Sequence, residues 1–212
     1  MSRFSQAISE GDGISVIPAL AGDVADLAAQ AEEAGAEAIA VATRAEAEVA
    51  RAAAALPVLV REPIRDGDQV VQIGQAGGDA VVCVFDDLDG DDGVLEDLQE
   101  RAADLDVDLA LAVDDEEELE RALERIDPDV VLIASSGADS DEEELERALD
   151  LLPDVPAGKL VVAESRAISR EQVLALERAG VDALIVRDLG AGPGFAGAIR
   201  ALVGGSASGP TP

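Results

Sequence analysis

Chemically reactive side chains directly follow three apolar runs of this chain: Arg61 and Glu62, then Glu164, Ser165 and Arg166, then Arg187. Guanidinium groups bind phosphates and carboxylates through paired N–H donors. We therefore predict that Arg166 and Arg187 form a clamp for a phosphate or a carboxylate. The alternative is that these arginines pair with carboxylates of the chain itself, namely Glu62, Glu164 or Asp188.

A glycine-rich stretch, GAGPG at residues 190–194, comes soon after Arg187 and leads into a short helical pattern. Helix N-termini that follow the last strands of a barrel often bind phosphate through backbone N–H groups. Gly190 and Gly192 are therefore predicted to contribute to the phosphate site. Stretches of this kind are also common in ordinary turns.

Several kinds of chemistry are excluded by residue type, because the chain has no histidine and a single cysteine, Cys83, which we interpret as a small core residue. Catalytic triads and zinc sites that contain histidine cannot be built, and one cysteine cannot hold zinc alone. Five carboxylates could in principle gather around magnesium, but their spacing matches no calcium-binding loop: Glu62, Asp66, Asp86, Asp87 and Glu164. No Walker loop is present. We predict neither a metal nor a cofactor.

The elements that must position these side chains repeat eight times as a short apolar run followed by an amphipathic helical pattern. Continuous apolar runs are typical of parallel strands covered on both faces. The spacing favours an α/β fold, a (β/α)8 TIM barrel in a single domain over residues 1–203, with an open doubly wound sheet as the alternative. Residues 204–212 are predicted to form a disordered tail. The predicted strands are 15–20, 38–42, 57–60, 80–85, 109–113, 130–134, 160–163 and 183–186.

Helical patterns cover residues 23–34, 45–55, 91–104, 115–126 and 169–179. The last of these is expected to begin after Ser169 as N-cap and to end at Gly180. Residues 67–75 are less clear, because their β-branched residues disfavour a helix. Pro18 could pair in the first strand only at an edge or a bulge.

One internal repeat is visible, since DDEEELERALERI at residues 114–126 recurs as SDEEELERALDLL at residues 140–152. Both copies place acidic residues in the first helical turn, where they favour the positive end of the helix dipole. We interpret the repeat as two solvent-facing barrel helices rather than as a duplicated binding helix.

The segments AEAIAVAT, PVLVRE, GGDAVVCV, AVDDEEELERAL, VVAES and AGVDALIV occur in an order and spacing that resemble the indole-3-glycerol-phosphate synthase family over residues 14–203. The resemblance implies a TIM-barrel lyase of tryptophan biosynthesis. Members of this family close an indole ring on an anthranilate-derived ribulose phosphate, with loss of carbon dioxide and water.

The resemblance fails at most of the family's working positions. The family's Glu and Lys after the first strand correspond to Ala19 and Ala21, its Glu on strand five to Ala112, and its Asn on strand six to Ala134. Arg61 stands in place of the family's acid lysine on strand three, whereas Glu164 and Ser165 are retained. Arg166 and Arg187 stand where the family has glycines near the phosphate. The family's helical N-terminal extension is expected to be absent, since about 14 residues precede the first strand.

The resemblance leaves Glu164, Ser165 and Arg61 as the candidate catalytic residues. Ring closure with dehydration needs groups that exchange protons near neutral pH. Arg61 keeps its proton below about pH 12, and alanine has none to transfer. We therefore expect a non-catalytic or repurposed barrel that binds an anionic small molecule such as a sugar phosphate. The alternatives are an active synthase, another lyase or isomerase on this scaffold, and a regulatory or assembly protein.

The net charge of -31, from 46 acidic and 15 basic residues with Lys159 as the one lysine, is spread over the whole chain. Such a charge opposes binding to nucleic acid and to anionic membranes. It is typical of adaptation to a salt-rich cytoplasm, where the Debye length falls to about 3 Å in molar salt. No apolar run approaches the length of a membrane span, and no signal peptide is visible. We predict a halophilic cytoplasmic protein of undetermined oligomeric state.

Overall fold

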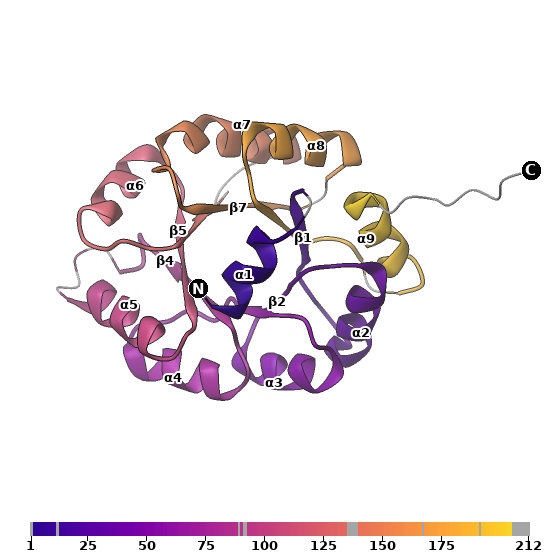
Figure 1. Cartoon of the computed structure of the whole chain (residues 1–212), viewed down its shortest axis with the longest axis horizontal. Coiled ribbons are helices and arrows are strands. Elements are labelled where there is room, and N and C mark those ends of the chain that lie inside the picture. The colour runs from indigo at the N-terminus through magenta and orange to yellow at the C-terminus, as the bar shows by residue number, and fades with distance from the viewer. Residues whose placement is uncertain are drawn as a thin grey trace, which may run out of the picture.

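Eight parallel strands form a nearly closed barrel in the computed structural model, which describes residues 2–11, 13–88, 90, 93–134, 140–166, 168–190 and 192–204 (Figure 1). The hydrogen-bonded order is β1-β8-β7-β6-β5-β4-β3-β2, so that each strand follows its predecessor around the barrel. The predicted (β/α)8 fold is confirmed. The strands are β1 (Ser15–Pro18), β2 (Ile39–Val41), β3 (Val58–Val60), β4 (Ala80–Val84), β5 (Asp108–Val113), β6 (Val130–Ile133), β7 (Leu160–Ser165) and β8 (Ala183–Val186).

Helices surround the barrel, and their ends follow the capping chemistry of the sequence (Figure 1). Ser169 caps α8 in a capping box with Gln172, and Gly180 ends the helix in the left-handed conformation with φ of 108°, both as predicted. Residues 67–75 are helical, because Asp66 and Gln69 form a capping box and Val70 and Ile73 pack into the core. The barrel helices are α2 (Val24–Ala34), α3 (Arg44–Ala53), α4 (Gly67–Gln75), α5 (Val94–Asp104), α6 (Glu116–Leu123), α7 (Asp141–Leu151), η1 (Leu152–Asp154), α8 (Arg170–Ala179) and α9 (Phe195–Val203).

The junction between β1 and β2 is the weakest in the barrel. Among the described residues, these strands are joined by an Ala19–Ala40 bridge and by a hydrogen bond of 2.8 Å from the Leu20 N–H to the Ala40 carbonyl. The Ala19 N–H donates to the Val186 carbonyl of β8. Because successive backbone N–H groups point to opposite sides of a strand, the backbone nitrogen of residue 18 faces β2. Pro18 has no N–H to donate there, which confirms the prediction that it lies at an edge.

The apolar core has two parts, one inside the barrel and one between the barrel and its helices. The inner part contains small residues such as Ala38, Ala80 and Ala110 beside Leu59 and Ile185. Cys83 lies in the outer part with no exposed surface, as predicted, and burial together with the nearby Asp87 charge raises the pKa of its thiol to about 12. No helix in the described part of the chain is long and apolar enough to cross a membrane.

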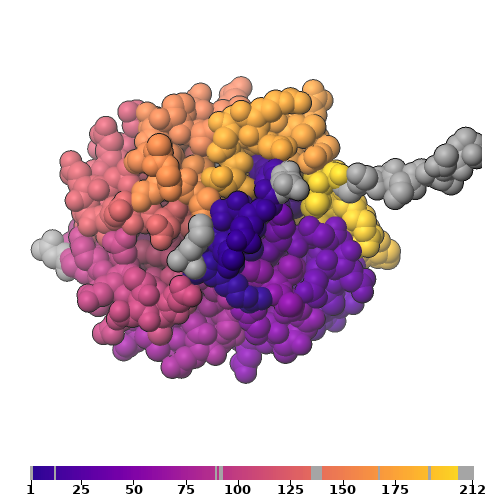
Figure 2. All heavy atoms as spheres, in the orientation of Figure 1, coloured from indigo at the N-terminus to yellow at the C-terminus, as the bar shows by residue number. Residues whose placement is uncertain are grey.

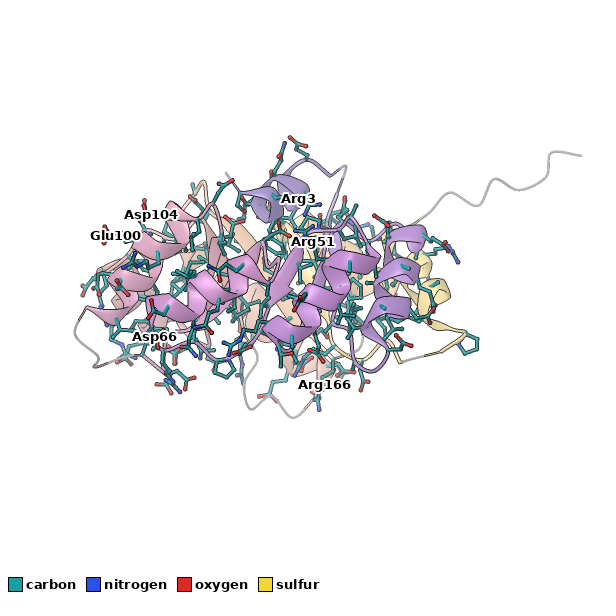
Figure 3. All side chains as sticks on the ribbon, turned by 90° about the horizontal axis from the view of Figure 1, so that it is seen from below. Arg3, Arg51, Asp66, Glu100, Asp104 and Arg166 are labelled. Carbon is teal, nitrogen blue, oxygen red and sulfur yellow. The ribbon has the colours of Figure 1, made fainter. Side chains whose placement is uncertain are left out.

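A short N-terminal helix, α1 (Arg3–Ser9), lies across the barrel face where the strands begin, and the sequence analysis did not anticipate it (Figure 2). Phe4 and Ile8 are buried in the inner core, where they fill the space left by the small strand residues. From the side, Arg3 and Arg51 lie at this face, whereas Asp66 and Arg166 lie at the opposite one (Figure 3). The helix therefore covers the end of the barrel away from the predicted site.

Asp108, at the start of β5, fixes the beginning of α1. Its carboxylate accepts hydrogen bonds from the Ser2 hydroxyl and, at 2.8 Å, from the Ser5 N–H. Burial raises the pKa of Asp108, and the hydrogen bonds from Ser2 and Ser5 only partly oppose that shift. Because the folded state holds the proton more tightly than the unfolded chain does, ionised Asp108 reduces stability at neutral pH.

We expect the free energy of unfolding of the Asp108→Asn variant to fall relative to that of the natural chain as the pH is lowered from 7 to about 4. The natural chain gains stability as Asp108 takes up its proton over this range, whereas asparagine cannot titrate. Free energies of unfolding from urea titrations at several pH values measure the difference. Asp104→Asn, at the exposed end of α5, serves as control. A difference that does not vary with pH would contradict the role given to Asp108.

Candidate functional site

Side chains alternate between the two faces of each strand. This alternation determines which of them point into the carboxyl end of the barrel, here called the mouth. Leu59, Val162 and Ile185 face the inside of the barrel. Residues two positions later on the same strand face the same side. Arg61, Glu164 and Arg187 accordingly meet at the mouth, as expected if strand ends carry the chemistry of a barrel.

Glu164 connects two arginines through one oxygen atom. Its Oε1 lies 2.5 Å from Nη2 of Arg61 and 3.1 Å from Nε of Arg187. The Glu164 side chain is only 7% exposed, whereas the two arginine side chains are about one-third exposed. The retained glutamate therefore already binds two cations of the chain.

Glu144, in the first turn of α7, is the second carboxylate of the mouth and is 1% exposed. Its Oε1 lies 2.5 Å from Nη2 of Arg187 and 3.3 Å from Nε of Arg166. Its Oε2 accepts hydrogen bonds from the Ser165 hydroxyl at 3.1 Å and from the Arg166 N–H at 2.8 Å. Arg166 also lies 3.6 Å from Asp141. We call Arg61, Arg166, Arg187, Glu144 and Glu164 the mouth cluster.

A cavity of about 360 Å³ opens beside the mouth cluster. Arg61 and Arg187 form its polar side. Aliphatic residues of β2 and of the segments directly after β1 and β2 form the rest: Ala19, Leu20, Ala21, Ala40, Val41 and Ala42. The cavity therefore presents guanidinium groups on one side and an apolar wall on the other, which suits an anion with an apolar part.

Four alanines occupy the positions at which the resemblance led us to look for working residues. Ala19 and Ala21 line the cavity, Ala112 is buried on β5, and Ala134 packs against the inner core after β6. None of these side chains can exchange a proton. Among the described residues, the two carboxylates that meet the arginines of the mouth, Glu144 and Glu164, are held in ion pairs.

The predicted partners of the arginines were only partly correct, because Glu144 was not among the candidates. Glu62 pairs with Arg44 at 3.0 Å instead. The repeat concealed Glu144, since its counterpart Glu118 faces back to the Asp114 N–H at 2.9 Å. The helix α6 begins after Asp115 and α7 after Ser140, so that Glu118 is the third helical residue and Glu144 the fourth. A comparison of the two N-caps could have revealed this difference.

Gly190 and Gly192 lie apart from these contacts. Both have positive φ, 70° and 135°, and the Phe195 N–H donates to the Gly192 carbonyl at the start of α9. A Cβ atom at either position would meet no atom of the described residues within 4 Å. The glycines thus serve the turn into α9, and their contribution to a phosphate site stays a prediction.

The carboxylates considered for magnesium do not gather. Asp66 caps α4, Asp87 pairs with Arg65 at 3.3 Å, and Glu62 and Glu164 have the arginine partners given above. Within the described ranges, no group of three or more histidine, cysteine or acidic residues is arranged to hold a metal ion.

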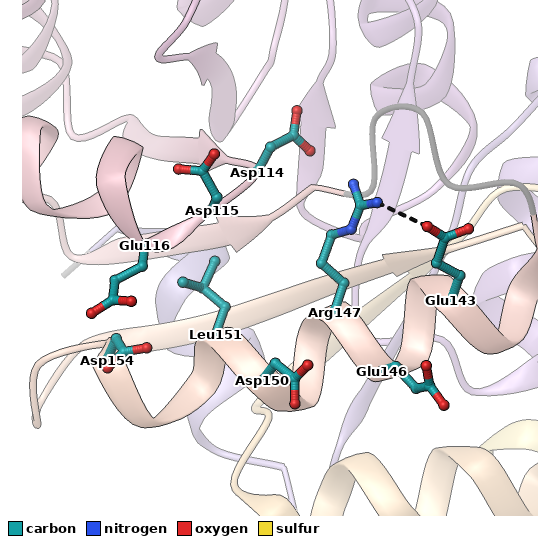
Figure 4. A pocket seen from close by; sticks show the side chains of 9 residues that line it. All are labelled: Asp114, Asp115, Glu116, Glu143, Glu146, Arg147, Asp150, Leu151 and Asp154. Atoms are coloured by element: carbon teal, nitrogen blue, oxygen red, sulfur yellow. Dashed lines mark hydrogen bonds and ion pairs between the residues drawn. The ribbon is translucent and has the colours of Figure 1, made fainter.

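A second cavity, of about 330 Å³, lies on the outer surface between the start of α6 and the length of α7 (Figure 4). Its walls are acidic, and Arg147 pairs there with Glu143 at 3.3 Å. An anion would be repelled by this surface. The acidic lining is Asp114, Asp115, Glu116, Glu143, Glu146, Asp150 and Asp154.

Sequence comparisons agree with the resemblance. The family model described as indole-3-glycerol phosphate synthase matches residues 19–189. An indole-3-glycerol phosphate synthase from Verminephrobacter eiseniae (strain EF01-2) is 35% identical over 150 residues, which are 69% of this chain and 55% of that protein. The match thus spans little more than half of the relative's length.

Solved structures share the fold at low identity. The aldolase QR15 has a TM-score of 0.68 at 16% identity, with 90% of this chain and 92% of that chain covered. An N-acetylmannosamine-6-phosphate 2-epimerase from Clostridium perfringens has 0.67 at 14% (82% and 86% covered). The tryptophan synthase A-subunit from Pyrococcus furiosus has 0.68 at 14% (91% and 98%). These likenesses concern the barrel alone.

Proposed function

Because this chain belongs to the indole-3-glycerol-phosphate synthase family, we propose that it is a divergent member whose mouth binds a phosphate- or carboxylate-bearing small molecule without closing the indole ring. The observation that carries this proposal is the cavity at the mouth, whose polar groups are Arg61 and Arg187. A family enzyme with its proton-transfer residues replaced keeps the scaffold and the opening but lacks the means of reaction.

Arg61 and Arg187 have more N–H donors than hydrogen bonds to described residues, which supports the proposal that they bind an anion. A guanidinium group has five N–H donors. Within the described residues, Arg61 donates one hydrogen bond, to Glu164, and Arg187 donates one, to Glu144. Both residues line the cavity, and Arg187 has a further ion-pair contact with Glu164, 3.1 Å from Nε. Charge-assisted hydrogen bonds to a carboxylate or phosphate are the strong ones.

The net negative charge of the chain determines the salt concentration at which anion binding should be tested. With a net charge of -31, the protein surface repels anions in dilute buffer. Molar salt screens that repulsion within about 3 Å, so that the local charges of the mouth decide binding. We propose that the protein works in a salt-rich cytoplasm, and the test below is therefore made in concentrated potassium chloride.

Thermal unfolding should reveal the ligand class. At a hundredfold excess over its Kd, an anion that binds the mouth is expected to raise the unfolding temperature by about 5–10 °C. Inorganic phosphate, a sugar phosphate and a small apolar carboxylate are compared with potassium chloride at equal ionic strength. The matched chloride sample matters, because salt alone stabilises so acidic a chain.

Arg61→Gln separates specific binding from a general salt effect. Arg61 has Glu164 as its partner, and Glu164 keeps Arg187, so this variant leaves the remaining ion pairs in place. The affinity for the anion is expected to fall about 10- to 100-fold. Arg65→Gln, a half-exposed arginine paired with Asp87, is the control. The proposal fails if no anion exceeds chloride, or if both variants respond alike.

A further inference from the structure

Glu144 is surrounded by donors of the kind that bind an oxyanion. The Ser165 hydroxyl and the Arg166 N–H donate to one of its oxygens, at 3.1 and 2.8 Å. Guanidinium nitrogens of Arg187 and Arg166 approach the other, at 2.5 and 3.3 Å. With 1% of its side chain exposed, Glu144 sits inside this arrangement rather than at its rim.

The donors belong to the barrel and the carboxylate to a helix outside it. Ser165 ends β7, and Arg166 and Arg187 come directly after β7 and β8. Glu144 reaches them from the first turn of α7. One backbone N–H, one hydroxyl and two guanidinium groups at adjoining strand ends would form an anion site without Glu144.

We infer that the carboxylate of Glu144 occupies an oxyanion site at the ends of β7 and β8, and that this residue determines that phosphate does not bind there. The inference rests on the proposed function, because it leaves Arg61 and the cavity side of Arg187 as the place for an external anion. Glu144 is thus a specificity-determining residue that acts by occupying the site with its own charge.

The geometry also indicates which ligand the site would accept if Glu144 were removed. The Nε atoms of Arg166 and Arg187 are buried and make no well-directed hydrogen bond to any described residue, although they lie 3.3 Å from Glu144 and 3.1 Å from Glu164. A carboxylate offers two oxygens in one plane, whereas a tetrahedral oxyanion offers four in different directions. The emptied site should therefore bind inorganic phosphate.

Replacement of the carboxylate tests this inference as a gain of binding. Glu144→Ala is expected to unfold at a lower temperature than the natural chain without phosphate, because Arg187 and Arg166 lose a buried partner. Inorganic phosphate, titrated against potassium chloride at equal ionic strength, should bind the variant at least about tenfold more tightly than the natural chain. Calorimetric titration and the rise in unfolding temperature both measure this gain.

Glu118→Ala is the matched control, because Glu118 is the counterpart of Glu144 in the other copy of the repeat and accepts a hydrogen bond from the Asp114 N–H instead of contacting the mouth cluster. It should respond to phosphate as the natural chain does. Equal phosphate binding by the two variants would overturn the inference.

Two further measurements keep the result interpretable. If Glu144→Ala does not fold, nuclear magnetic resonance of Arg61→Gln decides, because this variant weakens the separate anion site at the cavity. Its Arg166 amide signal should stay in place under phosphate, since the hydrogen bond to Glu144 is already made, and a phosphate-dependent shift would overturn the inference. The double variant Glu144→Ala with Arg61→Gln should keep the gain. If this double variant keeps the gain in phosphate binding while the natural chain binds no anion, the proposed function is refuted and the inference about Glu144 stands.

Discussion

Purified protein in concentrated salt is expected to form no detectable indole-3-glycerol phosphate from the family's open-chain substrate. General acid–base groups are each worth about 10²–10⁴-fold in rate, and alanine stands at four positions where the resemblance implies working residues. Arg61 cannot act as the missing acid, since a guanidinium group keeps its proton. Glu164, the retained carboxylate, is bound by Arg61 and Arg187. The combined loss should place turnover below detection.

Fluorescence of the indole product measures this directly, with an established family enzyme assayed in the same salt as the positive control. A genetic test adds independent evidence, because a tryptophan auxotroph lacking its own synthase should not grow when it expresses this chain. Product formation above that of heat-denatured protein, or growth of the auxotroph, would establish an active synthase and refute the proposal that the chain does not close the indole ring.

Phe4→Ala is expected to destabilise the barrel by about 3–5 kcal/mol. Phe4 has no exposed surface and packs with Ile8 into an inner core that is otherwise rich in small residues. Truncation removes apolar contact and leaves a void that alanines of the strands cannot fill. Because domains are stable by only about 5–15 kcal/mol, a loss of this size is a large share of the total. Urea unfolding in constant salt measures it.

Gln6→Ala on the exposed side of the same helix is the control, and should change the free energy of unfolding by less than about 0.5 kcal/mol. Gln6 makes a hydrogen bond to Glu10 at 2.9 Å on the protein surface. Similar effects of both substitutions would mean that α1 contributes through its own helical stability and not through burial of Phe4.

The barrel could be predicted from the sequence because each strand is a continuous apolar run and several helices carry their caps in the sequence. Ser169 and Gly180 bound α8 as expected, and Pro18 lies at the weak junction. Half of the sixteen strand ends match the prediction, and the other half differ by one or two residues. The predicted helix at 91–104 begins at Val94 in the structure, and its first two positions lie outside the described residues, as does all but Gly204 of the predicted tail.

The two omissions have physical reasons. The helix α1 is seven residues long, too short for a periodic apolar pattern, and it forms because Phe4 and Ile8 enter a barrel end that only the closed structure creates. Glu144 was assigned to solvent because its helix resembles α6 residue by residue. A shift of one position in the N-cap changes which acid faces inward, and local sequence carries that shift only weakly.

The proline in β1 has a consequence for how a ligand could enter. Transient opening costs least where a barrel has the fewest cross-strand bonds, and in the described residues that place is between the first and second strands. The segment directly after the first strand and the second strand itself contribute to the apolar wall of the cavity. We therefore expect that local opening of that wall would admit a bulky ligand of the proposed kind, while the charged side is held in place by its ion pairs.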